Sequence, residues 1–276
     1  MKLVKIIFFF CITLLGIKFI KSEIDLNNDK KLVKSCFGEE FCDGRIQALE
    51  KLVKAKKSLK NYNLEKADLN HASLSNADLK QANLIGASLY SATLSSANFT
   101  NASLSNADLR NAYLTNANFT SANLTNTNLS RRRLSINSAN INNANFANAN
   151  LTNTNLSGVS IHNANFSGVD LIGVNLTDAE LDGANLTNTR LINVDFKQAN
   201  LIGANLNGTY FHQVENITSR QLSQSCNWQL AIYKIQQDRE SGDLVVDKAA
   251  NKKFIEQLKI EFSDFTDRPV DCSKWK

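Results

Sequence analysis

Several features that catalytic and metal sites depend on are scarce in this 276-residue chain. It has three histidines and a single proline, and it contains neither a glycine-rich phosphate loop nor a Gly-x-Ser-x-Gly nucleophile turn. His71, His162 and His212 fall at positions that we expect to point outward, and the last two are fifty residues apart. We therefore expect no catalytic site, no metal site, no cofactor and no enzymatic activity.

The apolar run near the N-terminus is too short for an ordinary membrane span. It covers residues 6–17, whereas a spanning helix needs about 20 residues. Lysines flank it on both sides: Lys2, Lys5, Lys18 and Lys21. This pattern predicts a signal peptide at residues 1–22, cut after Ser22, and a secreted or periplasmic protein. Because Ile20 fits the cleavage preference for small residues poorly, an uncleaved segment that anchors the chain in a membrane is the alternative.

A strong charge of one sign is also missing. The formal net charge is +5, but four of the lysines belong to the N-terminal segment, and without it the net charge is near +1. A nearly neutral chain has no general basic surface for nucleic acid, so we expect no nucleic-acid partner.

Four cysteines remain after the N-terminal segment: Cys36, Cys42, Cys226 and Cys272. An even number in an exported chain indicates two disulfides, and four cysteines allow three connectivities. Four free thiols would instead require a reducing compartment.

A five-residue repeat dominates residues 62–213. A large apolar residue recurs at every fifth position, first from Leu64 to Leu134 and then from Ile141 to Phe211, in about thirty units. A small residue, mostly Ala, lies two residues before each apolar centre. Neither the helical nor the strand period buries two residues in every five, so we predict short extended segments joined by turns. Glycines two residues after a centre, such as Gly86, indicate a turn position with positive φ.

These units, for example "ADLNH ASLSN ADLKQ ANLIG", resemble those of the pentapeptide-repeat family. The resemblance implies an all-β solenoid, a right-handed quadrilateral β-helix with four units per coil and a length of about 35 Å. It also implies that Phe99 stacks on Phe119 and Phe146 on Phe166, because each pair is twenty residues apart. Some family members mimic DNA and bind gyrase. Residues 64–212 carry nine acidic and eight basic residues, a poor imitation of a polyanion, so this activity is the alternative function.

The tube that the resemblance implies also selects a disulfide pairing. Its ends lie much farther apart than the ~7 Å Cα limit for a disulfide, so we expect Cys36 to pair with Cys42 and Cys226 with Cys272. A solenoid must cover its terminal coils, and we therefore expect helical caps at residues 23–61 and 214–276.

Both caps contain helix signals. Upstream we predict a helix at about 44–59 with Asp43 as its N-cap. Its lysines form a solvated face or, as the alternative, a basic patch for a membrane or polyanion: Lys51, Lys54, Lys56, Lys57 and Lys60. Downstream, Thr218 and Gln221 form a capping-box pattern, and a second helix is predicted over 247–262.

The repeat breaks once, near residues 130–138. Seven residues separate Leu134 from Ile141 where five are expected, which indicates a two-residue insertion. Arg132 falls where a small buried residue belongs, and an unpaired buried guanidinium would cost several kcal/mol. We therefore expect a loop that turns three arginines outward, either as a structural accident or as a binding loop for an anion or a partner: Arg131, Arg132 and Arg133.

Together these features predict a non-enzymatic exported scaffold or protein-interaction module that presents flat β-helix faces. The partner is an unidentified protein, and membrane contact is expected only if the N-terminal segment is uncleaved. The ladders of Asn, Ser and Thr on the faces serve turns and hydrogen bonding or, as the alternative, bind a protein or a glycan. An enzyme assembled in the helical tail is the least favoured alternative. The oligomeric state is not set by the sequence.

Overall fold

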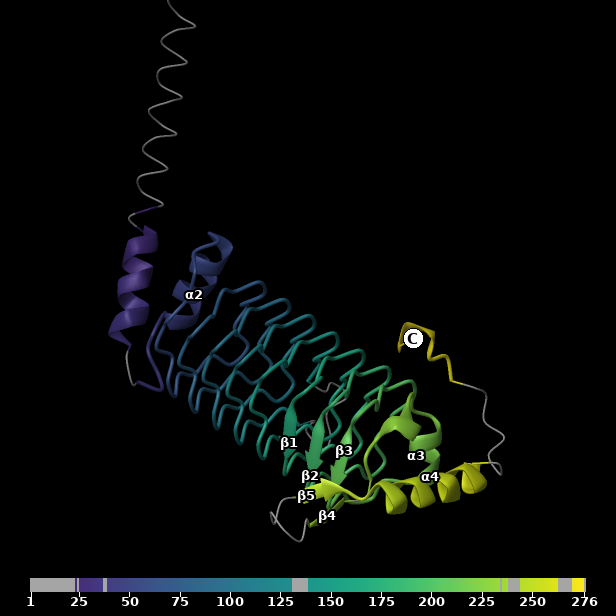
Figure 1. Ribbon diagram of the computed structural model, residues 1–276. Helices are drawn as coiled ribbons and strands as arrows, with labels where there is room; N and C mark the ends of the chain where they lie inside the picture. The colour runs from purple at the N-terminus through teal and green to yellow at the C-terminus, as the bar shows by residue number, and fades with distance from the viewer. Residues whose placement is uncertain are drawn as a thin grey trace, which may run out of the picture.

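The structure, a computed structural model of the chain, is a row of stacked coils with helical segments at both ends (Figure 1). It describes residues 23, 25–36, 39–130, 139–233, 235–237, 244–262 and 270–275. The predicted signal peptide and the three arginines of the expected binding loop, Arg131, Arg132 and Arg133, lie outside the described residues.

Successive coils pair with each other at an offset of twenty residues. Asn63 bridges Asn83 in parallel, and Asn83 in turn bridges Ser103. The N–H of Leu64 donates to the carbonyl of Asn83 at 2.7 Å, and the N–H of Asn83 donates to the carbonyl of Tyr62 at 2.9 Å. Main-chain groups that a lone extended segment would leave unpaired are therefore satisfied by the next coil. This pairing gives the chain a β-helix type of fold.

Three coils carry longer strands that form one parallel sheet. These are β1 (Asp170–Ile172), β2 (Arg190–Ile192) and β3 (Tyr210–His212), in that order. Their central residues, Leu171, Leu191 and Phe211, are aligned with each other and buried.

Two residues in every five point inward, as the spacing predicts. Ala72 and Leu74 are fully buried, whereas the polar residue between them is exposed. Some units carry threonine at the small position, and its hydroxyl is satisfied locally. Thr189 Oγ1, for example, donates to the Phe166 carbonyl at 2.8 Å. The predicted turn position has positive φ, 66° at Gly86 and 62° at Asn76.

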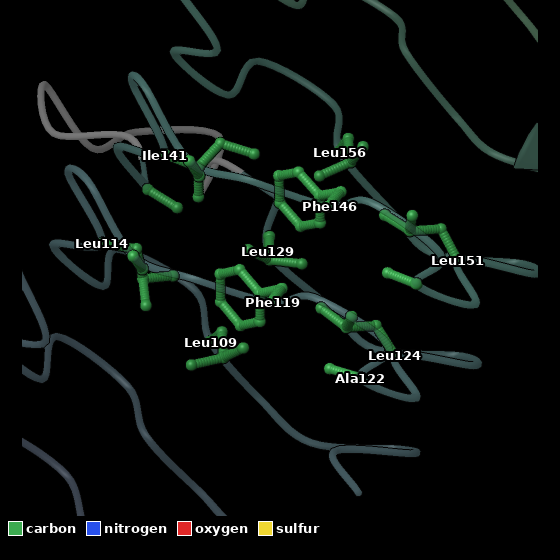
Figure 2. Packing of buried hydrophobic residues seen from close by; sticks show 14 of the residues in the cluster. Leu109, Leu114, Phe119, Ala122, Leu124, Leu129, Ile141, Phe146, Leu151 and Leu156 are labelled. Atoms are coloured by element: carbon green, nitrogen blue, oxygen red, sulfur yellow. The ribbon is translucent and has the colours of Figure 1, made fainter. Parts of the chain in front are cut away.

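A column of stacked phenylalanines runs through the core: Phe99, Phe119, Phe146 and Phe166. Successive ring centroids lie 4.9, 5.0 and 4.7 Å apart, and the rings are nearly parallel. Figure 2 shows the middle pair with Leu114 and Ile141 on one side and Leu124 and Leu151 on the other. Both predicted pairs are present, and a third contact, Phe119 on Phe146, joins them across the break in the repeat.

The break is larger than the sequence predicts. Tyr113 bridges Asn140, and the N–H of Leu114 donates to the Asn140 carbonyl at 2.7 Å, so Ile141 follows Leu114 in its column. These partners are twenty-seven residues apart in the chain, so this coil carries seven additional residues. The expected two-residue insertion is therefore wrong. Pairing between coils and stacking of the phenylalanines decide the register here, and spacing along the chain does not.

The N-terminal end contains helical residues 25–35 and α2 (Arg45–Lys54). The helix predicted at 44–59 is therefore too long, and Asp43 is not its N-cap. Gly44 takes that place with φ 80° and no side-chain cap. The Arg45 guanidinium is buried and donates to the carbonyls of Cys36, Glu39 and Glu40, and burial lowers its pKa. Cys36 and Cys42 lie at disulfide distance, with Cα atoms 5.8 Å apart.

The C-terminal end begins with α3 (Ser219–Ser223), where the predicted capping box between Thr218 and Gln221 is confirmed. The 3-10 helix η1 (Trp228–Leu230) follows, and then an antiparallel pair that the sequence did not predict, β4 (Ile235–Gln237) with β5 (Leu244–Val246). Helix α4 (Lys248–Phe262) corresponds to the predicted second helix and packs against α3. The 3-10 helix η2 (Ser273–Trp275) comes last among the described residues.

Tyr233 ties this end to the last coil. Its ring stacks on Phe211 at 4.9 Å and meets Phe254 of α4 at 5.2 Å. Its hydroxyl donates to the Trp228 carbonyl at 2.8 Å, and burial raises the pKa of this phenol.

Candidate functional site

A groove of about 720 Å³ lies where residues 270–275 cross the outer wall of the later coils. We call it the C-terminal groove. Its principal lining residues are His162, Asp182, Ile202, Gln224, Val270 and Lys274. A concave surface that combines apolar side chains with a few convergent polar groups is the usual form of a binding site.

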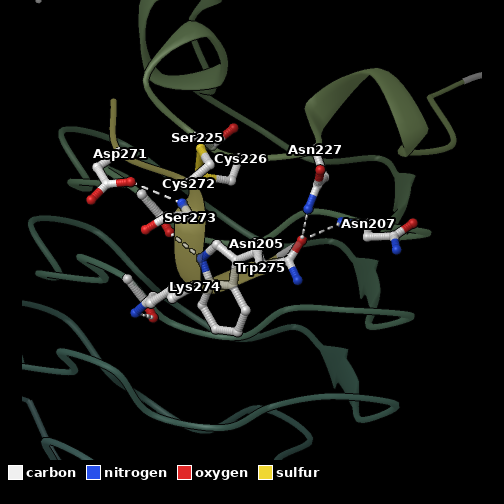
Figure 3. Close-up of a disulfide and its surroundings, with 12 residues drawn as sticks. Asn205, Asn207, Ser225, Cys226, Asn227, Asp271, Cys272, Ser273, Lys274 and Trp275 are labelled. Atoms are coloured by element: carbon white, nitrogen blue, oxygen red, sulfur yellow. Dashed lines mark hydrogen bonds between the residues drawn. A yellow bond between two sulfur atoms is a disulfide. The ribbon is translucent and has the colours of Figure 1, made fainter. Parts of the chain in front are cut away.

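Covalent and polar contacts hold the crossing segment in place. Cys226 and Cys272 lie at disulfide distance, with Cα atoms 5.7 Å apart (Figure 3). Lys274 Nζ donates to Asn163 Oδ1 and to the Gly183 carbonyl, each at 2.8 Å. Trp275 Nε1 donates to the carbonyl of Gly203, in the next coil, at 2.9 Å. The segment is therefore one wall of the groove.

The coil wall is glycine where the segment crosses. The corresponding turn one coil earlier carries Asn163, whereas Gly183 leaves room for the lysine. A Cβ added at Gly183 would lie 2.5 Å from Lys274 Nζ and 2.7 Å from Asn163 Oδ1. Partial burial in this crossing lowers the pKa of Lys274, whose ammonium also lies 4.5 Å from the centre of the Trp275 ring.

His162 lies between two carboxylates of the next coil. Its Nε2 is 3.2 Å from Glu180 Oε2, and its Nδ1 is 3.2 Å from Asp182 Oδ2. Asp182 Oδ1 accepts a hydrogen bond from Asn200 Nδ2 at 2.8 Å. Both ring nitrogens face carboxylate oxygens, which can accept a hydrogen bond from a ring N–H. The arrangement suits recognition by charge and hydrogen bonding.

The other histidines lie in different surroundings. His71 packs edge-on against Tyr90, with ring centroids 5.7 Å apart, and His212 lies beside Tyr210 at 6.4 Å. The structure therefore does not bring the three histidines together. Within the described part of the chain, no three His, Cys, Asp or Glu side chains are grouped so as to hold a metal ion.

The sequence did not predict the two carboxylates beside His162. Glu180 and Asp182 flank the apolar centre Leu181, one coil after Ile161. The available signal was their offset of eighteen and twenty residues from His162, which places these side chains on the same wall.

The asparagines that directly precede the apolar centres form hydrogen bonds within the tube. Asn185 Nδ2 donates to Asn165 Oδ1, and Asn165 Nδ2 donates to Asn145 Oδ1, each at 3.1 Å. Asn118 Oδ1 accepts from the N–H and the hydroxyl of Thr120. These contacts support the turns and link the coils. Asn101, Asn106 and Asn116, which lie at the turn position, are exposed.

The coiled region matches two family profiles. "Pentapeptide repeats (8 copies)" matches residues 63–101 and 92–131, and "Pentapeptide repeat region" matches residues 139–215. Together these matches cover more than half of the chain. The chain belongs to the pentapeptide-repeat family.

Solved structures of other pentapeptide-repeat proteins resemble it. HetL, involved in heterocyst differentiation regulation in the cyanobacterium Nostoc, is 27% identical over 68% of this chain and 83% of HetL, with a TM-score of 0.24. A trypsin-treated form of QnrB1, a plasmid-mediated fluoroquinolone resistance protein, is 21% identical over 54% of this chain and 70% of QnrB1, with a TM-score of 0.33. A protein from the Arabidopsis thaliana thylakoid lumen is 18% identical over 71% of this chain and 88% of that protein, with a TM-score of 0.12. Scores this low do not establish a shared detailed shape.

No curated protein matches the chain. Among the described residues, which begin at residue 23, no helix has both the length and the apolar character required to cross a membrane.

Proposed function

We propose that this pentapeptide-repeat protein is an exported, non-enzymatic scaffold that binds a protein partner. Its coils form a right-handed quadrilateral β-helix whose two ends are covered by the helical segments. The observation that carries the binding role is the C-terminal groove, where an exposed Ile202 lies beside His162 and Asp182 of the coils and the charged Lys274 of the C-terminal segment. A suitable occupant is a partner protein whose surface presents its own apolar residue surrounded by charged residues.

The cysteine pairs support export. Each pair lies within one end of the tube, Cys36 with Cys42 and Cys226 with Cys272. Such disulfides persist in oxidising compartments and not in the cytosol, which agrees with the signal pattern in residues 1–22.

The charges on the tube give no support to DNA mimicry. A mimic of DNA needs rows of unpaired acidic groups, whereas here Asp108 pairs with Arg110 at 2.6 Å and Asp170 with Arg190 at 3.0 Å. Protection of gyrase by the purified protein would nevertheless favour that alternative over the exported scaffold.

Crosslinking in the native host followed by affinity purification tests the binding role. The Ile202→Glu variant places a charge in the groove, and Ile85→Glu is its matched control, because Ile85 is a comparably exposed isoleucine on an earlier coil. We expect a partner that crosslinks to the native protein and to Ile85→Glu and is lost from Ile202→Glu. Equal recovery with both variants would show that the groove is not the binding surface.

A further inference from the structure

We propose that the N-terminal end of the protein docks on a membrane surface that carries anionic lipids. The docking surface is a lysine patch made of five side chains: Lys54, Lys56, Lys57, Lys60 and Lys80. This inference goes beyond the proposed scaffold role and does not depend on the C-terminal groove.

Two structural neighbourhoods bring the five lysines together. Lys54, Lys56 and Lys57 line a depression of about 630 Å³ between the end of α2 and residues 75–78 of the coils. Lys60 and Lys80 occupy equivalent positions in adjacent coils, where the N–H of Asn61 donates to the Lys80 carbonyl at 3.0 Å. The two groups of lysines adjoin each other, because residues 54–60 form one short stretch of chain.

The patch carries more positive than negative charge. Lys57 pairs with Glu23 at 3.1 Å, and Lys80 lies 4.0 Å from Asp78. The other three members, Lys54, Lys56 and Lys60, are exposed, and no carboxylate among the described residues lies within 4 Å of them. Three cations are therefore available to phosphate groups outside the protein.

The position of the patch favours lipid as the source of those phosphates. Lys57 holds Glu23, the first described residue, so the chain enters the domain beside the patch. In the sequence, five residues separate the apolar run at 6–17 from Glu23, so Ile17 and Glu23 are six residue steps apart and span at most about 22 Å. When this run is in a bilayer, before cleavage or as a retained anchor, the patch is within reach of the headgroups. An apolar segment combined with a basic patch is the kind of two-part signal that gives stable membrane attachment.

Vesicle flotation of the full-length chain tests this proposal. The native protein is compared on phosphatidylcholine vesicles with and without phosphatidylglycerol, so that any insertion of the apolar run contributes equally to both. The test variant replaces Lys54, Lys56 and Lys60 with Gln. The control variant makes the same charge change at the other end of the molecule, in α4, by replacing Lys248, Lys252 and Lys253 with Gln; these lysines are also exposed.

We expect the native protein to bind the anionic vesicles more tightly than the neutral ones, with an advantage that falls as salt rises. Each basic residue near an anionic surface contributes about fivefold in affinity, so the test variant should lose on the order of 100-fold and the control much less. Equal binding to both vesicles, or equal losses in both variants, would overturn the proposal. Tighter binding to heparin than to anionic vesicles would also overturn it, because the patch would then be a site for a soluble polyanion.

Discussion

The phenylalanine column allows the coil register to be measured across the break in the repeat. Phe119 is fully buried between Phe99 and Phe146, with centroid distances of 4.9 and 5.0 Å. Truncating such a residue to Ala should cost about 3–5 kcal/mol of unfolding free energy. Leu is the repeat's own residue at this position, so a Phe119→Leu substitution keeps the fold and removes mainly the stacking.

A double-mutant cycle with Phe119→Leu and Phe146→Leu isolates the contact across the break. Aromatic pairs contribute about 0.5–1.5 kcal/mol beyond their burial, and we expect a coupling energy in this range from urea unfolding followed by circular dichroism. The control cycle uses Phe99 and Phe119, which lie twenty residues apart with no break between them.

The register inferred from spacing alone gives a different result. With a two-residue insertion, Ile141 would lie over Phe119 and Phe146 would lie over Leu124. The cycle between Phe119 and Phe146 would then give a coupling near zero while the control cycle kept its value. That outcome would refute the closure of the coil across the seven additional residues.

Three further outcomes follow from the structure. Deleting residues 131–137 leaves "LSSANI", which matches the uninterrupted "LSSANF" at residues 94–99. Chemical denaturation should therefore show that the unfolding free energy changes by no more than about 1 kcal/mol. A loss of several kcal/mol would contradict the register. Burial raises the pKa of the Tyr233 hydroxyl, so as the pH rises the unfolded chain loses the hydroxyl proton before the folded chain does. The free energy of unfolding should therefore stay constant below about pH 10 and fall above it, by about 1.4 kcal/mol at pH 11. Denaturation of Tyr233→Phe should lack this part of the fall, and an identical pH profile would show that the phenol is accessible. The Cys272→Ser variant should release the C-terminal segment and red-shift the fluorescence of Trp275, and an unchanged spectrum would show that the hydrogen bonds hold the segment without the disulfide.

Much of the coil wall could be predicted from the sequence because each unit repeats the same local pattern of two buried positions and a turn. Ala72 and Leu74 are buried for the reason that every equivalent pair is buried, and Gly86 has positive φ because the turn requires it. The capping box at Thr218 is equally local, since both partners lie within four residues.

The register at the break could not be obtained in this way. Leu134 continues the apolar spacing of the first block, so a local pattern includes it. The contact between Phe119 and Phe146 is a property of two coils, and it places Ile141 over Leu114 instead. A comparison of whole coils was needed.

Distance along the chain explains why the C-terminal groove was not predicted. The C-terminal groove joins His162 to residues 270–275, which lie more than a hundred positions later. The start of α2 was misplaced because Asp43 has the right chemistry for an N-cap, whereas the buried Arg45 and its three carbonyl partners determine how the chain enters the helix.

Export of the protein can be tested by determining its compartment and the state of its cysteines in one experiment. Cells are fractionated, free thiols are alkylated, and the protein is analysed by mass spectrometry without reduction. We predict a chain outside the cytoplasm with two internal disulfides, Cys36 with Cys42 and Cys226 with Cys272. A full-length chain in the cytoplasm with all four of these cysteines alkylated would contradict export of the protein.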